Sequence, residues 1–146
     1  MGRLDLLLTL DDFYSHHARV RKGHTLLPHL CTMSKVAAIQ AAFESGDTEA
    51  LEALVHDDYR FIPHVGEMVL GKSDFIGFAG SGGVTMENHR ILFENDDIGI
   101  EHGIAHFANG STSEAVLSFN RFKDGKLILT ETGATPLSDD YQLIGS

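Results

Sequence analysis

The clearest hydrophobic pattern of the chain begins near residue 34 and has the period of a helix. Val36, Ile39 and Phe43 recur at helical spacing within an Ala-rich run, and Gly46 follows where a helix usually ends. A second short helix is predicted from its capping residue, Asp47 or Thr48. The apolar side of this second helix consists of Leu51, Leu54 and Val55.

The pattern then changes to that of strands. Residues 59–63 and 68–70 are predicted as two short strands, and the second ends at Gly71. Ser73 is predicted to cap a third short helix, and this helix ends at the glycine-rich residues 80–83. The rest of the chain predicts an antiparallel sheet with strands over 84–94, 97–108, 111–122 and 126–134.

Two dipeptides between these strands predict tight hairpins. Asn109-Gly110 and Asp124-Gly125 are strong hairpin sequences, because both central residues of such a turn need a positive φ. The predicted order of elements is α-α-β-β-α-β-β-β-β. This order belongs to the α+β class.

The first 32 residues have a different character. A short amphipathic helix is predicted from Leu4 through Phe13, and residues 16–24 show little pattern. We therefore divide the chain into an N-terminal extension, 1–32, and a patterned domain, 33–146. Two interpretations of the extension stay open: it packs on the domain or on a partner subunit, or the natural chain starts at Met33.

Composition and charge narrow the class of protein. The 146 residues are enough for one core, and 42% are hydrophobic and 22% charged, as in ordinary globular proteins. A net charge of −10 repels phosphate backbones and anionic lipids, so we expect neither nucleic acid nor membrane as a partner. Cys31 is the only cysteine, and the apolar run 6–10 is too short for a membrane span. We expect a cytoplasmic protein.

Four short sequences, taken with the order of elements, resemble the NTF2-like superfamily and its SnoaL-like and ketosteroid-isomerase-like domains. They are AAFESGD at 41–47, HDDY at 56–59, GKSDFI at 71–76 and FNRFKDGKL at 119–127. The resemblance covers about 34–135. It implies a bent, mostly antiparallel sheet wrapped around helices as a cone, with a pocket for a small hydrophobic molecule. It also implies chemistry without a cofactor: isomerisation, dehydration, cyclisation or epoxide hydrolysis.

Two motifs that point to other chemistry fail on physical grounds. Residues 66–73 fit the phosphate-loop pattern G-x-x-x-x-G-K-[ST], but their interior is strand-forming and Glu67 would present a negative charge to the phosphates. His102 and His106 are four residues apart, which in a strand is about 13 Å and too far for one metal ion. We predict no metal site and no cofactor.

When the catalytic positions of the resembling families are compared with this sequence, most of their catalytic residues are absent. The Tyr, the Asp base and the acidic donor of ketosteroid isomerases correspond here to Ile39, Ile62 and Ser118. The acid on the last strand of SnoaL-like cyclases and limonene-epoxide hydrolases corresponds to Thr132. The acids of these mechanisms are therefore missing. We expect these four positions, together with Phe43, to line the pocket.

Strand alternation extends this set of pocket residues. If Ile62 points into the pocket, His64 does too, although His64 could instead follow Pro63 into a surface turn. The inward sides of the strands that carry Ser118 and Thr132 add Glu114, Asn120 and Thr130. His64 is the predicted base, because its side chain titrates near neutral pH.

Two signals disagree about which side of strand 97–108 faces inward. An even-length turn at Asn109-Gly110 pairs Glu101 with Ser118 and puts Glu101 inside. The more apolar face of the strand carries His102 and His106, and a bulge would turn this face inward instead. We favour Glu101 inside, with Glu101 or Ser118 orienting the substrate of His64.

The sequence leaves three functions open. The first is an enzyme acting on a small hydrophobic ketone, epoxide or polyketide-like substrate. The second is a small-molecule binder without catalysis, in keeping with the missing acids. The third is an association module that uses the surface of its sheet.

A homodimer is predicted from the outward faces of the same strands. Together these faces form a large apolar surface patch. In soluble proteins such a patch is usually buried against another surface, most commonly that of a second copy of the chain related by a two-fold axis. The Leu-rich N-terminal segment is the rival cover. The predicted patch comprises Ala115, Leu117, Phe119, Leu127, Leu129, Ile98, Ile100, Ile104, His102 and His106.

Overall fold

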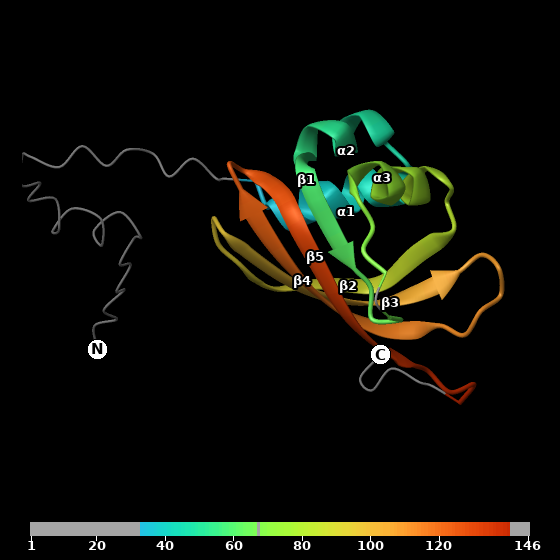
Figure 1. Ribbon diagram of the computed structural model, residues 1–146. Helices are drawn as coiled ribbons and strands as arrows, with labels where there is room; N and C mark the ends of the chain where they lie inside the picture. The colour runs from blue at the N-terminus through green and yellow to red at the C-terminus, as the bar shows by residue number, and fades with distance from the viewer. Residues whose placement is uncertain (1–32, 67, 141–146) are drawn as a thin grey trace, which may run out of the picture. The chain divides into compact units, whose positions relative to one another are not determined.

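The three helices of the domain begin and end at recognisable capping residues. A computed structural model describes residues 33–66 and 68–140 (Figure 1), so the predicted N-terminal helix and the rest of the extension lie outside the described residues. Helix α1 (Lys35–Ser45) starts where the Ser34 hydroxyl accepts the Ala37 N–H and ends at Gly46, whose φ is 64°. Helix α2 (Thr48–Leu54) starts at Asp47.

Helix α3 (Lys72–Gly80) begins one residue before the predicted cap. The N-cap is Gly71 rather than Ser73, and the Asp74 carboxylate accepts the Gly71 N–H at 3.0 Å. The Lys72 ammonium contacts the Asp57 carboxylate at 2.9 Å and the Glu52 carboxylate at 3.0 Å. The hydrogen bond from Lys72 holds the pKa of Asp57 below its usual value. Two of the four resembling sequences, 56–59 and 71–76, are therefore joined through Lys72 and Asp57.

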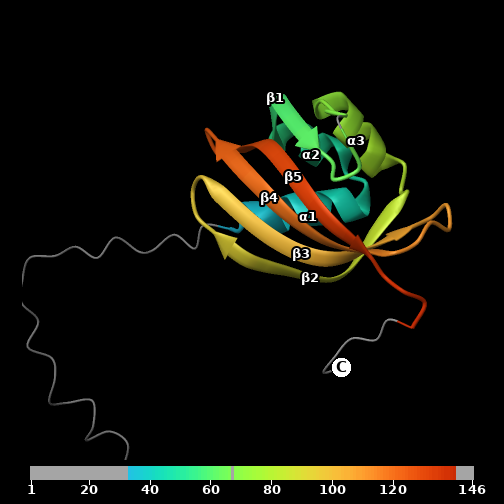
Figure 2. The ribbon, with the colours of Figure 1, turned by 60° about the horizontal axis from the view of Figure 1, so that its bottom comes forward.

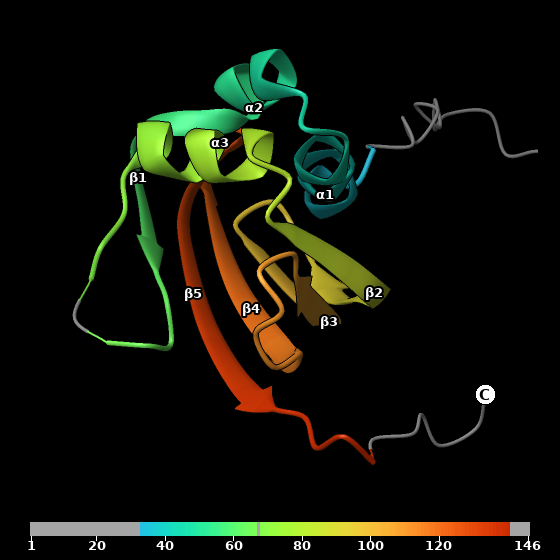
Figure 3. The ribbon, with the colours of Figure 1, turned by 90° about the vertical axis from the view of Figure 1, so that its right-hand side faces the viewer.

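One five-stranded sheet forms the other layer of the domain. Its strands are β1 (Val55–Ile62), β2 (Val84–Glu94), β3 (Ile98–Phe107), β4 (Glu114–Lys123) and β5 (Lys126–Pro136), in the order β1-β5-β4-β3-β2. The β1 and β5 strands are parallel, and every other pair is antiparallel. Figures 2 and 3 show the sheet bending around α1, with all three helices on its concave side. The predicted α+β cone is confirmed.

The predicted second strand is reduced to a single bridge. Leu70 exchanges both backbone hydrogen bonds with Phe61, at 2.8 and 3.0 Å, and its neighbours form no strand. The predicted first strand is longer than expected and begins at Val55, immediately after α2. The order of the other elements is as predicted, and in the connection between β1 and α3 only Leu70 pairs with β1 among the described residues.

The two predicted hairpins behave differently. Asp124 and Gly125 have φ values of 52° and 76°, as the predicted turn requires. At the other hairpin only Gly110 has a positive φ, and the loop is 108–113, so β4 begins at Glu114 rather than at residue 111. The longer loop also has an even number of residues, so the pairing of Glu101 with Ser118 is kept. The predicted register of this hairpin is confirmed.

A bulge in β5 reverses one predicted orientation. Phe122 pairs with Leu127 while Arg121 pairs with Leu129, so Ile128 is an extra residue. Leu127 is consequently only 1% exposed and packs in the core with Val55 and Phe122, although alternation had placed it on the outer face.

The outer apolar patch also differs from the prediction. Ile104 is 3% exposed, and it lies in a depression bordered by the loop 110–113 and by Leu137–Asp139. The exposed large apolar side chains of the outer face are Leu117 on β4 and Phe93 on β2. Ile91 and Leu92 of β2 are also exposed, but Ile91 pairs with Glu101 on the inner side. No helix within residues 33–66 and 68–140 is long and apolar enough to cross a bilayer.

Candidate functional site

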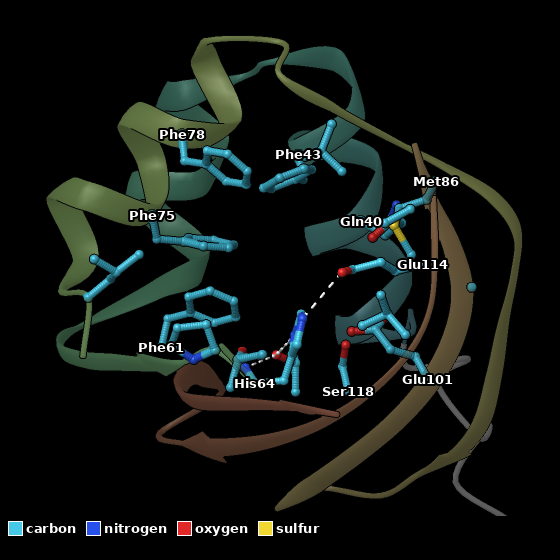
Figure 4. Close-up of a pocket in the computed structure, with 18 of the residues that line it drawn as sticks. Gln40, Phe43, Phe61, His64, Phe75, Phe78, Met86, Glu101, Glu114 and Ser118 are labelled. Atoms are coloured by element: carbon cyan, nitrogen blue, oxygen red, sulfur yellow. Dashed lines mark hydrogen bonds and ion pairs between the residues drawn. The ribbon is translucent and has the colours of Figure 1, made fainter. Parts of the chain in front are cut away.

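A cavity of about 800 Å³ lies between the helices and the concave face of the sheet. Most of its wall is apolar and comes from α1, α3, β1, β2 and the loop after β1. Figure 4 shows Phe61, Phe75 and Phe78 on one side and Glu101 and Ser118 on the other. The aromatic lining residues are Phe43, Phe61, Phe75, Phe78, Phe107 and Phe122.

The aromatic side of the cavity is a packed cluster centred on Phe75. Its ring centroid lies 5.6 Å from that of Phe43, 5.1 Å from that of Tyr59 and 6.3 Å from that of Phe61. These rings come from α1, α3 and β1, so the cluster ties the helices to the first strand. The rings are tilted relative to one another by 34–52°, as aromatic packing favours, and they form an apolar wall opposite the sheet.

Nine of the ten predicted site residues line this cavity. They are Ile39, Phe43, His64, Glu101, Glu114, Ser118, Asn120, Thr130 and Thr132. The exception is Ile62, and here the prediction is wrong. On β1 the buried Tyr59 and the cavity-lining Phe61 point inward, so alternation turns Ile62 outward. His64 reaches the cavity from the turn after the strand, not by alternation from Ile62.

Glu101 is held by two side chains on the sheet wall. Its Oε2 lies 2.6 Å from Nε2 of His89, and its Oε1 accepts the Asn120 amide at 2.7 Å. Asn120 in turn accepts the Thr130 hydroxyl at 2.7 Å. The Glu101 and His89 side chains are 16% and 19% exposed, so this short contact lies in a largely desolvated place. Either side chain of the pair can give or take the proton between them.

His89 is the site residue that the sequence analysis missed. On β2, Val84 and Met86 line the cavity, so strict alternation would turn Asn88 inward and His89 outward. Asn88 instead has a φ of 52°, at a bulge between Glu87 and Arg90, and this turns His89 toward Glu101. The one available signal was Asn88 itself, because Asn tolerates positive φ better than most residues.

Gly103 permits this bulge on the neighbouring strand. A side chain at Gly103 would place its Cβ 3.5 Å from both the Glu87 carbonyl oxygen and the His89 Cα, and 2.7 Å from the Met86 methyl. The glycine therefore lets β2 approach β3 closely where the chain bulges.

A second histidine–carboxylate pair lies on the same wall. His64 Nε2 is 3.3 Å from Glu114 Oε2, and the two side chains are 26% and 17% exposed (Figure 4). The Thr132 hydroxyl accepts the His64 backbone N–H at 3.2 Å, which fixes the turn over the end of β5.

The two pairs occupy different ends of the wall. Glu101 is opposite Ser118, and Glu114 is opposite Ala105, so four residues separate the pairs along each strand. At the rise of a strand this is about 13 Å. His64 and Glu101 each have their own partner and do not act on one atom together.

The two histidines of β3 face away from the cavity. His102 lies 3.4 Å from Arg90, and His106 lies 2.8 Å from both Ser113 and Glu87. Among residues 33–66 and 68–140, no three His, Cys, Asp or Glu side chains gather as a metal site would require.

Tyr59 is a buried side chain behind the site. Burial raises the pKa of its hydroxyl well above the usual value, the Glu101 charge raises it further, and the Thr130 hydroxyl lowers it somewhat. Thr130 is thus near, yet the Tyr59 hydroxyl makes no hydrogen bond of good geometry with the described residues. An unsatisfied buried hydroxyl costs about 1–3 kcal/mol.

Replacing Tyr59 with phenylalanine should therefore stabilise the domain by about 1 kcal/mol in urea unfolding. Thr130→Val is the matched control and should destabilise it, because the Thr130 hydroxyl is buried and bonded to Asn120. Above about pH 10 the wild type should lose stability more steeply than the variant, since the unfolded tyrosine ionises while the folded one keeps its proton. A destabilised Tyr59→Phe would mean that the hydroxyl has a partner.

A bent sheet folded around three helices, with an apolar cavity and polar side chains on its sheet wall, defines an NTF2-like fold. The chain belongs to the SnoaL-like domain family, whose model matches residues 36–130. A search of curated proteins finds no significant match.

Three solved structures illustrate the likeness of fold. An NTF2-like protein of unknown function from Cytophaga hutchinsonii is 14% identical with a TM-score of 0.59, over 70% of this chain and 88% of that one. IdmH from Streptomyces antibioticus, a proposed polyketide cyclase, is 18% identical with a TM-score of 0.55, over 68% and 88%. An LEH-like epoxide hydrolase from Mycobacterium tuberculosis is 17% identical with a TM-score of 0.53, over 69% and 80%.

Proposed function

We propose that the chain is an enzyme that moves protons on a small hydrophobic substrate, with Glu101 as the group that exchanges the proton. The observation that carries this proposal is the 2.6 Å contact between Glu101 and His89 at the wall of an apolar cavity. The likeness of fold to a proposed polyketide cyclase and to an epoxide hydrolase supports a pocket of this kind.

The chemistry follows from the contacts of Glu101. As a carboxylate, Glu101 can take a proton from a carbon next to a substrate carbonyl. His89, in contact with the same carboxylate, stabilises its negative charge before the transfer. Asn120 fixes the other carboxylate oxygen, so the base has one orientation. Ser118, directly across from Glu101 on β4, can donate its hydroxyl proton to the developing enolate oxygen.

The fate of the enolate would decide the reaction. Return of the proton from Glu101 to another carbon gives an isomer. Attack of the enolate carbon on a second carbonyl of the same substrate instead closes a ring, and the alkoxide that forms takes the proton back from Glu101. Both outcomes leave Glu101 as it began. This assignment moves the base from His64, which the sequence favoured, to Glu101, because the turn that carries His64 pairs it with Glu114 instead.

Proton abstraction can be tested before the natural substrate is known. A panel of cyclic and aryl ketones is incubated with the protein in deuterium oxide, and loss of the α-proton signal is followed by NMR. We expect exchange faster than the buffer background for at least one ketone. Binding of several ketones without faster exchange for any would favour the alternative, a binder without catalysis.

A homodimer remains our proposal for the outer face of the sheet. Leu117 on β4 is 48% exposed, and Phe93, which pairs with Ile100 on the neighbouring strand, is 49% exposed. We expect sedimentation to show a dimer at micromolar concentration and neutral pH, and Leu117→Glu to give a folded monomer whose melting temperature is lower only by the lost association. A monomeric wild type would show that this face needs no second copy.

A further inference from the structure

The cavity contains a polar pair that the proposed proton transfer does not use. His64 and Glu114 lie about 13 Å from the Glu101 pair along the sheet. A carboxylate that is 17% exposed has lost most of its hydration, and a single ion pair replaces only part of it. Among the described residues, Oε1 of Glu114 has no hydrogen-bond partner. Glu114 therefore has an acceptor to offer inside the cavity.

The wall between the two pairs has little polarity. On the sheet side it consists of Gly103 and Val116, which face each other between the two pairs, and the rings of Phe61 and Phe75 lie across from it. A ligand that reaches both pairs must therefore be apolar along its middle. A ligand with a polar centre would lose hydration there without gaining a hydrogen bond.

We propose that His64 and Glu114 form a second polar subsite, which binds a hydroxyl group at the far end of an elongated apolar ligand whose near, reacting end lies at Glu101. This inference rests on the proposed function of the cavity and adds the class of substrate. Glu114 accepts the distant hydroxyl, and His64 holds Glu114 in place. Glu101 takes the near end, so the two acidic residues set the length of the ligand.

Charge decides against an acidic ligand. Glu101 and Glu114 both face the cavity, and the chain has a net charge of −10. A carboxylate at either end of the ligand would meet a carboxylate in a place of low exposure. The subsite should therefore select hydroxyl donors over acids of the same size.

Three biphenyls test the subsite by calorimetry. The oxygens of 4,4′-dihydroxybiphenyl are about 10 Å apart, and a hydrogen bond of about 2.7 Å at each end, bent at the hydroxyl oxygen, extends this span to about the 13 Å between the two pairs. The wild type should bind this diol at least about tenfold more tightly than 4-hydroxybiphenyl, because a hydrogen bond to a charged group is gained. It should bind 4′-hydroxybiphenyl-4-carboxylate more weakly than either.

Glu114→Ala should remove the advantage of the diol while leaving the affinity for the mono-ol within about twofold. Glu131→Ala, on the outer face of β5, is the matched control and should keep the tenfold ratio. If Glu114→Ala does not fold, His64→Gln replaces it, and the ratio should then fall because Glu114 loses its support.

Equal affinity of the wild type for diol and mono-ol, or no binding of the diol, would overturn the proposal. An equal loss for both ligands in Glu114→Ala would do the same, because it would show a general effect on the cavity. These measurements do not depend on turnover. A retained diol preference without ketone exchange would therefore overturn the enzyme and keep the subsite.

Discussion

Replacing Glu101 with glutamine should lower the rate of ketone α-proton exchange by about 10²–10⁴-fold. Glutamine keeps the size of the side chain and can still bond to Asn120, but it cannot take a proton at the pH of the assay. The fold should change little, because the cavity keeps its shape, and the affinity for ligand should fall by about tenfold at most, because a neutral acceptor replaces a charged one. Exchange by NMR, melting temperature and calorimetry measure the three quantities separately.

Two further variants give this result its meaning. Glu131→Gln makes the same chemical change on the exposed outer face of β5 and should leave exchange unchanged. His89→Gln should lower the rate less than Glu101→Gln and change its dependence on pH, since His89 acts through Glu101. If Glu101→Gln exchanges protons at the wild-type rate, the base is elsewhere, and His64 becomes the next residue to test.

Placing alanine at Gly99 should destabilise the domain by about 2–3 kcal/mol. A Cβ at Gly99 would overlap the Val36 side chain of α1 and lie 3.2 Å from the Phe122 ring. Val36 is 2% exposed and Phe122 is 6% exposed, so neither has free space into which to move. The helix would have to shift away from β3, at the end of the cavity where α1 meets the sheet. Urea unfolding measures the loss.

Gly133→Ala is the matched control for this variant. Gly133 is also a strand glycine without positive φ, and a Cβ there would meet nothing within 4 Å. Its free energy of unfolding should stay within about 0.5 kcal/mol of the wild type. A Gly99→Ala variant as stable as Gly133→Ala would show that α1 can move from β3 at little cost.

Local sequence determined the ends of α1 and α2 and the register of the β3–β4 hairpin, although the cap of α3 is Gly71 and not the predicted Ser73. The Ser34 and Asp47 caps, the end of α1 at Gly46 and the Asp124-Gly125 turn all depend on a few neighbouring residues. Such residues act through their own φ preference or a hydrogen bond within one turn, so their effect can be read without the rest of the chain. The even length of the loop after β3 then placed Glu101 beside Ser118 on the inner face.

Bulges set the orientations that the sequence did not reveal. Asn88 turns His89 into the site, and the extra residue Ile128 turns Leu127 into the core. A bulge exchanges the faces toward which the following side chains of its strand point. It forms only where the bent sheet and the neighbouring strand leave room for the extra residue. On β3, Gly103 leaves this room beside the bulge at Asn88, because it has no side chain.

The residues after β1 show the same division. Period-two alternation predicted that Ile62 and His64 share a face, and this holds only while the chain remains a strand. The strand ends at Ile62, and Thr132 on β5 holds the backbone of His64 in a turn. The sequence thus identified His64 as a pocket residue. Its partner Glu114 was fixed by a contact between segments 50 residues apart, because only the folded sheet brings the turn and the start of β4 together.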